Sequence, residues 1–137
     1  MENMDRLDVI FALQKSLDED IMKRRDLHYS YEEWMQKDAL ACIEEIMEVL
    51  NEVQYKWWKN RKPQDQKAIQ EELVDVLHFF VSMCIRSGMD GTALYEGYIA
   101  KNRENFDRQY GRSQKQGYEV KEVVGEEKAD EETDKEV

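Results

Sequence analysis

The sequence predicts an all-α protein: a bundle of four to five helices that forms a dimer and ends in a disordered acidic tail. The 137 residues include one proline and six glycines, so few residues would break a helix from within. Apolar residues recur at intervals of three and four along four segments, and no segment shows the strict alternation of a half-buried strand. A chain of this length can bury a core as one domain.

Two helices are expected in the N-terminal half. The first covers residues 6–24, where apolar side chains form a stripe beside Gln14. After a short break, Ser30 and Glu33 match a capping box that predicts the start of a second helix, which runs to about Gln54. One arc of the second helix is apolar, and the opposite arc carries Glu44, Glu45, Glu48 and Glu52.

The third helix is the most apolar part of the chain. An aromatic and basic connection at residues 55–63 precedes it, Asp65 is a suitable N-cap, and the helix is expected to end near Gly88. Residues 71–85 are apolar on nearly every side, so this stretch is expected to be buried almost all round. Asp75 lies within it and therefore needs a cation, an ion pair or a proton.

A fourth helix is predicted to run from the turn at residues 90–92 to about Tyr110. Asp90 or Thr92 is available as its N-cap, and Gly111 as its end. Spacings of three and four place four side chains on one face of this helix: Tyr98, Lys101, Asn105 and Arg108.

Charge and composition exclude several classes of protein. The formal net charge is −11, of which −6 falls within residues 119–137, a segment with little apolar content that is expected to be a disordered tail after a domain at residues 1–118. An acidic chain is not expected to bind nucleic acid. The sequence has neither a long apolar run nor signal-peptide character, so a soluble, cytoplasmic protein is expected. Cys42 and Cys84 are expected to be reduced packing residues.

Two acidic pairs are the strongest chemical feature. Glu45 and Glu48 share one face of the second helix, and Glu72 and Asp75 share one face of the third. If these helices pack antiparallel, the four carboxylates converge and cannot all remain ionised without cations. Oxygen ligands of this kind suit Mg²⁺ or Mn²⁺, whose coordination is commonly completed by substrate phosphates. A nucleotide polyphosphate site is therefore indicated.

Structural alternatives exist for each of these residues. Glu45 and Glu48 alone are also typical of a solvated helix face. Asp75 could instead form a buried ion pair with a lysine or arginine. A di-iron site is a further alternative, but it requires Glu-x-x-His pairs, and His78 has no symmetric mate. We therefore expect His78 to be a hydrogen-bonded core residue.

The connection between the second and third helices combines aromatic and basic residues. Trp57 and Trp58, flanked by Lys56 and Lys59, offer a surface for stacking a base beside charges for phosphate, although plain packing is an equally good explanation.

Two further groups offer polar contacts to a nucleotide. Lys101, Asn105 and Arg108 could clamp an anionic substrate, or they could form a solvated face. Gln14 offers the donor and acceptor that match a pyrimidine edge, and its amide can turn to suit uracil or cytosine.

These motifs closely resemble those of the dimeric, all-α dUTPase family, which belongs to the wider all-α nucleotide pyrophosphohydrolases of the MazG type. The resemblance spans roughly residues 7–118 and excludes the acidic tail. It is carried by Glu-Glu-Ile-Met-Glu (44–48), Trp-Trp-Lys (57–59), Glu-Glu-Leu-Val-Asp-Val-Leu-His-Phe-Phe (71–80) and Tyr-x-x-Lys-Asn-x-x-Asn-x-x-Arg-Gln (98–109).

The resemblance implies a homodimer and a role for each motif. The carboxylates that match the family's Mg²⁺ ligands are Glu45, Glu48, Glu72 and Asp75, and either of the first two would also orient or deprotonate the attacking water. Residues that match or adjoin the family's base contacts are Gln14, Trp57 and Lys59. Asp18 stands near a position where some members carry an asparagine. Contacts to the triphosphate and sugar are implied for Lys101, Asn105 and Arg108, with Tyr118 expected to close over the site.

The first functional hypothesis is hydrolysis of dUTP to dUMP and pyrophosphate with the help of two or more Mg²⁺ ions. A second hypothesis keeps the chemistry but changes the base, as in a dCTP or broad-specificity pyrophosphatase. A third is a non-catalytic helical dimerisation or adaptor module, which an apolar third helix and an acidic tail would also suit.

Overall fold

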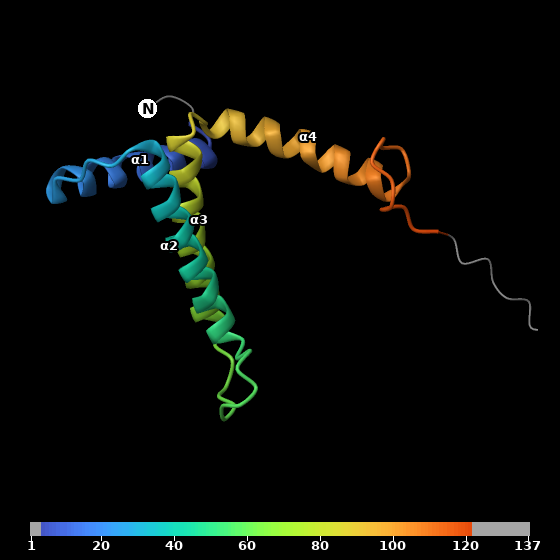
Figure 1. Cartoon of the computed structure of the whole chain (residues 1–137), viewed down its shortest axis with the longest axis horizontal. Helices are drawn as coiled ribbons and strands as arrows, with labels where there is room; N and C mark the ends of the chain where they lie inside the picture. Colours follow the sequence, from blue (N-terminus) through green and yellow to red (C-terminus); the bar gives the residue numbers. More distant parts are fainter. Residues whose placement is uncertain (1–3, 122–137) are drawn as a thin grey trace, which may run out of the picture. The chain divides into compact units, whose positions relative to one another are not determined.

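The computed structural model describes residues 4–121, which contain four helices and no strand (Figure 1). The all-α prediction is therefore confirmed. No helix in this range is both long enough and apolar enough to cross a membrane. The expected acidic tail lies outside the described residues from residue 122 onward. In chain order the helices are α1 (Arg6–Arg25), α2 (Tyr31–Glu52), α3 (Gln66–Arg86) and α4 (Gly91–Gln109).

Side-chain caps fix where the helices begin, because each satisfies backbone N–H groups that have no partner within the helix. The capping box predicted for α2 is present, with Ser30 and Glu33 each accepting from the other's backbone N–H. Asp65 Oδ1 accepts from two backbone N–H groups in the first turn of α3. Asp90 Oδ1 accepts from the backbone N–H of Ala93 at 2.8 Å. The predicted caps of α2, α3 and α4 are thus confirmed.

Helices α2 and α3 form an antiparallel hairpin and share the most extensive packing contact between elements (Figure 1). The connection between them is held by Gln54, which has a positive φ of 51°. Its Oε1 accepts from the backbone N–H of Lys62 at 2.9 Å, and its Nε2 donates to the carbonyl oxygen of Asn60. One side chain therefore closes the connection.

The core lies where α1, the C-terminal half of α3 and the start of α4 meet. Phe11, Val81 and Cys84 are buried there, and Leu94 of α4 packs against them. Gly91 begins α4 so close to α1 that a Cβ atom would lie 2.7 Å from the Asp8 carboxylate. Both cysteines are free thiols, as expected. Contacts divide the chain after Tyr98 into two compact units.

The expectation that α3 is buried almost all round is wrong for the single chain. Leu73 and Val74 are each more than half exposed, and Asp75 is exposed as well. His78, expected in the core, is also exposed, and its Nδ1 contacts the carbonyl oxygen of Val74 at 2.9 Å. The reason is that α2 packs along α3 while the buried core with α1 forms near Val81, so the N-terminal half of α3 lacks cover on its other sides.

Candidate active site

Three of the four predicted carboxylates come together across the α2–α3 hairpin. Glu45 projects from α2, and Glu72 and Asp75 project from α3 with the three-residue spacing that puts them on one face. One carboxylate oxygen from each lies within 4.8 Å of the other two. Glu48, one turn further along α2, is exposed and outside this group. The antiparallel packing therefore makes the two acidic faces converge as the sequence predicts.

The electrostatics of this acidic cluster show uncompensated negative charge. Partial desolvation, the charges of Glu45 and Asp75 and a hydrogen bond to Glu45 raise the pKa of Glu72, with a smaller contribution from Glu48. None of these four residues forms an ion pair within residues 4–121. The lysine or arginine partner considered for Asp75 is thus not found there. An all-oxygen cluster without an internal cation fits a hard divalent ion.

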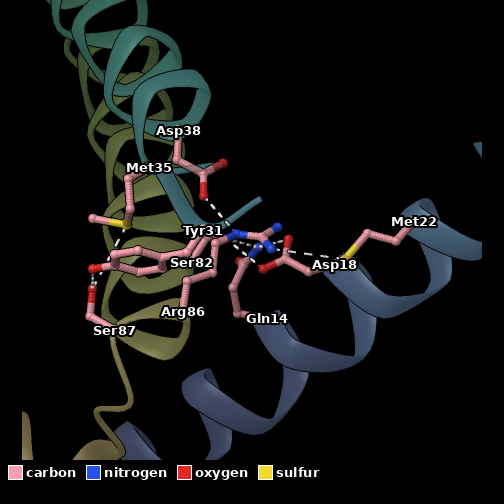
Figure 2. Close-up of polar contacts among 9 residues, drawn as sticks. All are labelled: Gln14, Asp18, Met22, Tyr31, Met35, Asp38, Ser82, Arg86 and Ser87. Atoms are coloured by element: carbon pink, nitrogen blue, oxygen red, sulfur yellow. Dashed lines mark hydrogen bonds and ion pairs between the residues drawn. The ribbon is translucent and has the colours of Figure 1, made fainter. Parts of the chain in front are cut away.

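Gln14 belongs to a closed ring of hydrogen bonds between α1 and α3 (Figure 2). Its Nε2 donates to Asp18 Oδ1 and to Ser82 Oγ, both at 3.0 Å. The Ser82 hydroxyl in turn donates to Asp18 Oδ2 at 2.7 Å. Gln14 and Ser82 are both buried. The glutamine predicted to face a base is therefore fixed by two polar neighbours, of which Ser82 was not predicted.

A cavity of about 320 Å³ joins this ring to the acidic cluster. Gln14, Asp18, Glu45 and Asp75 all contribute to its wall, so polar groups from α1 and carboxylates from α2 and α3 face one space. The rest of the wall is formed by Leu17, Ile21, His78 and Phe79. An apolar surface with a few polar groups beside a candidate cation site is suited to a small organic anion.

The connection between α2 and α3, which carries Trp57 and Trp58, lies at the end of the hairpin, away from this cavity. Trp57 is 86% exposed and packs edge-to-face on Trp58, and it is not among the residues that line the cavity with Gln14. Lys59 lines a separate hollow of about 380 Å³ together with Lys56 and Lys62. The structure therefore separates Trp57 and Lys59 from Gln14.

The predicted residues of the last helix form a local arrangement of their own. Arg108 Nε donates to Glu104 Oε1 at 3.0 Å, and the Arg108 guanidinium lies 5.4 Å from the ring centre of Tyr118. Glu104 also accepts from Ser113 Oγ at 2.6 Å, and these two hydrogen bonds lower the pKa of Glu104. Lys101 is exposed, as is Asn105. Arg108 and Tyr118 therefore lie together, and Glu104 is a partner that the sequence could have indicated through its i, i+4 spacing.

A second buried polar pair was missed by sequence reasoning. Arg86 Nε donates to Asp38 Oδ2 at 2.9 Å (Figure 2). The Arg86 guanidinium also stacks 3.8 Å from the ring centre of Trp34. Burial raises the pKa of Asp38, while Arg86 opposes that shift. The signal available was Ser82 and Arg86, two polar residues four positions apart in the otherwise apolar last two turns of the helix.

Fold and site together define an all-α domain with a candidate cation cluster beside a small-molecule cavity. A family model described as dUTPase matches residues 6–93, and the chain belongs to that family. The resemblance seen in the sequence motifs is thereby confirmed for these residues. The match ends before Lys101, so the proposed roles of the later residues rest on the motif resemblance alone.

Two curated relatives come from bacteriophages. The chain is 36% identical over 74 residues to a dCTP pyrophosphatase of Enterobacteria phage LZ5, and 35% identical over 74 residues to a dCTP pyrophosphatase of Enterobacteria phage T4. Each match covers 54% of this chain and 43% of the relative, so the aligned part is less than half of either relative's length. No solved structure matches the chain.

Proposed function

We propose that this protein hydrolyses a pyrimidine deoxynucleoside triphosphate to the monophosphate and pyrophosphate, using Mg²⁺ or Mn²⁺. The observation that carries this proposal is the meeting of Glu45, Glu72 and Asp75 at the edge of the cavity that Gln14 lines. Membership of the dUTPase family and the names of both phage relatives support the same class of reaction.

The carboxylates of α2 and α3 would perform the chemistry. A divalent cation would be held by Glu45, Glu72 and Asp75, and the nearby charge of Glu48 would add to the attraction. When bound, the cation supplies Lewis-acid stabilisation of phosphate charge and activates water. Glu45 or Glu48 would accept the proton of the attacking water. The water oxygen bonds to the α-phosphorus while the bond from that phosphorus to the bridging oxygen breaks, and pyrophosphate leaves.

The remaining predicted residues would bind the substrate. Gln14 would contact the base within the cavity. Roles for Trp57 and Lys59 in binding the substrate rest on the motif resemblance, because the structure separates both residues from Gln14. Contacts to the triphosphate and sugar would come from Lys101, Asn105, Arg108 and Tyr118. Arg108 can serve in this way because its ion pair with Glu104 is made through Nε, which leaves the two terminal nitrogens for phosphate oxygens.

A nucleotide panel tests the proposal. The family name favours dUTP, whereas the relatives' names favour dCTP as the second candidate. We expect Mg²⁺-dependent release of pyrophosphate from dUTP or dCTP, measured with dUTP, dCTP and dTTP in the presence and absence of Mg²⁺. Equal rates with all three would instead indicate a broad-specificity enzyme. No hydrolysis of any of them would contradict the proposal and leave the adaptor hypothesis.

Metal affinity is expected to rise with pH. The raised pKa of Glu72 means that this carboxyl keeps its proton to a higher pH than an ordinary glutamate, and a protonated carboxyl is a poor ligand. Calorimetric titration with Mg²⁺ should therefore give weaker binding at about pH 5 than at about pH 7.5. The same affinity at both values would argue against Glu72 as a ligand.

We also propose that the protein is a homodimer that buries the uncovered faces of α2 and α3. Leu40, Ile43, Leu73 and Val74 are each more than half exposed on these helices, which is unusual for a monomer. Light scattering at micromolar concentration should give twice the chain mass, and Ile43→Glu should shift the protein toward the monomer. A wild-type protein with the mass of one chain would refute the dimer.

A further inference from the structure

We infer that Asp18 and Ser82 lock the amide of Gln14 in one orientation, and that the cavity consequently prefers cytosine, whose exocyclic amine donates hydrogen bonds, over uracil and thymine. This inference rests on the proposed hydrolysis of pyrimidine nucleotides. It assigns both residues a part in the choice of base: Asp18 contacts the base and orients Gln14, and Ser82 is a positioning residue that acts through Gln14 and Asp18.

The hydrogen-bond ring permits only one orientation of the amide. An ionised carboxylate accepts hydrogen bonds and cannot donate, so the group 3.0 Å from Asp18 Oδ1 must be the NH₂ of Gln14. The Ser82 hydroxyl donates its single proton to Asp18 Oδ2 and therefore accepts from the same NH₂. Turning the amide would place its carbonyl oxygen against the carboxylate. Because Nε2 contacts both Asp18 and Ser82, the two amide protons are both engaged.

The amide oxygen is the part of Gln14 left for a ligand. No donor contacts Gln14 Oε1 among the hydrogen bonds of residues 4–121, and that range contains no fully buried side-chain oxygen without a partner. Since Gln14 is only 7% exposed and lines the cavity beside the acidic cluster, its small exposed surface includes this oxygen. Gln14 therefore presents an acceptor and no free donor.

The other polar groups on this side of the cavity are acceptors as well. Asp18 offers only carboxylate oxygens. His78 Nδ1 lies 2.9 Å from the carbonyl oxygen of Val74, so Nδ1 carries a proton, and in the tautomer protonated at Nδ1 the Nε2 atom is an acceptor. The remaining polar part of the wall is formed by Glu45 and Asp75 of the acidic cluster, which the proposed function assigns to the cation that binds phosphate.

A wall of acceptors discriminates between pyrimidines by their exocyclic group at position 4. The amine of cytosine can donate one hydrogen bond to Gln14 Oε1 and the other to Asp18. Uracil and thymine can donate only the single hydrogen on N3, and their O4 oxygen beside it would face acceptors and lose its hydrogen bond to water without replacement. Cytosine also has an acceptor at N3, but it offers two donor hydrogens to the wall instead of one. Sites that leave buried polar groups unpaired with the wrong substrate discriminate strongly against it.

The test compares kcat/KM for dCTP and dUTP in the wild type and in Asp18→Asn. We expect the wild type to prefer dCTP by about 10-fold or more. The asparagine amide at position 18 can donate to O4 of uracil, and without the carboxylate the Gln14 amide is free to turn. The ratio of kcat/KM for dCTP to that for dUTP should therefore fall by at least about 10-fold in this variant. The change should appear mainly in KM, because the base contact is the same before and during phosphoryl transfer. Ser82→Ala, which leaves Asp18 in place, should shift the ratio in the same direction by less.

Asp20→Asn is the matched control. Asp20 is also on α1 but forms an exposed pair with Arg24, so this variant should keep the wild-type ratio. A wild-type enzyme that hydrolyses both nucleotides without preferring dCTP would overturn the inference while leaving the proposed function intact. An unchanged ratio in both Asp18→Asn and Ser82→Ala would also overturn it. By contrast, a wild type with no activity on either nucleotide would refute the proposed function itself.

Discussion

Replacing Asp75 with asparagine is expected to lower turnover by about 100-fold or more, because it removes a charged ligand from the cluster that balances phosphate charge during the reaction. Glu72→Gln should have an effect of similar size, since the oxygens of Glu72, Asp75 and Glu45 lie within 4.8 Å of one another. The measurement is Mg²⁺-dependent release of pyrophosphate at saturating nucleotide. Both variants should retain the wild-type helical circular dichroism, because each replaced side chain makes no ion pair within the described residues.

Glu44→Gln is the control for this experiment. Glu44 directly precedes Glu45 on α2 but is exposed and outside the cluster, so it should keep near-normal turnover. A second readout is the thermal midpoint, which Mg²⁺ should raise in the wild type and in the control by binding only the folded state. Mg²⁺ should raise it less in Asp75→Asn. Near-normal turnover in both cluster variants would exclude the cluster as the metal site.

Replacing Arg86 with alanine is expected to destabilise the fold by about 3–5 kcal/mol, because it leaves the Asp38 carboxylate buried without its partner. Asp38 is 7% exposed, and burial already raises its pKa despite the nearby guanidinium. The substitution also removes the stacking of Arg86 on Trp34. For a domain of this size the thermal midpoint should fall by about 10 °C or more in a calorimetric or circular dichroism melt.

Arg24→Ala provides the comparison. Arg24 pairs with Asp20 at 2.8 Å, but both side chains are more than half exposed, so the loss should stay below about 0.5 kcal/mol. The double variant Asp38→Leu/Arg86→Met should recover much of the stability lost in Arg86→Ala, because it removes both buried charges. If Arg86→Ala and Arg24→Ala melted at the same temperature, the ion pair with Arg86 would not be what compensates the buried charge of Asp38.

Much of the fold could be predicted from local sequence features. Helix starts followed from short-range chemistry, since Ser30 and Glu33, Asp65 and Asp90 each act within three residues of the cap. The end of α4 followed from Gly111, whose φ of +71° suits glycine. Burial could not be predicted in this way. The apolar pattern of α3 does not record which sides other helices cover, and in this chain several sides stay open, including that of Asp75.

The candidate site, like the fold, could be predicted only in part from the sequence. The sequence by itself determined the four helices and the two acidic pairs, because spacings of three and four fix which side chains share a helical face. Only the tertiary structure decided that Glu45, Glu72 and Asp75 meet while Glu48 stays at the edge, and that Gln14 shares their cavity while Trp57 does not. It also decided the partners of Gln14, since Ser82 lies 68 positions away in the chain. Periodicity fixes the face of a helix, whereas the packing of α1, α2 and α3 fixes which faces meet.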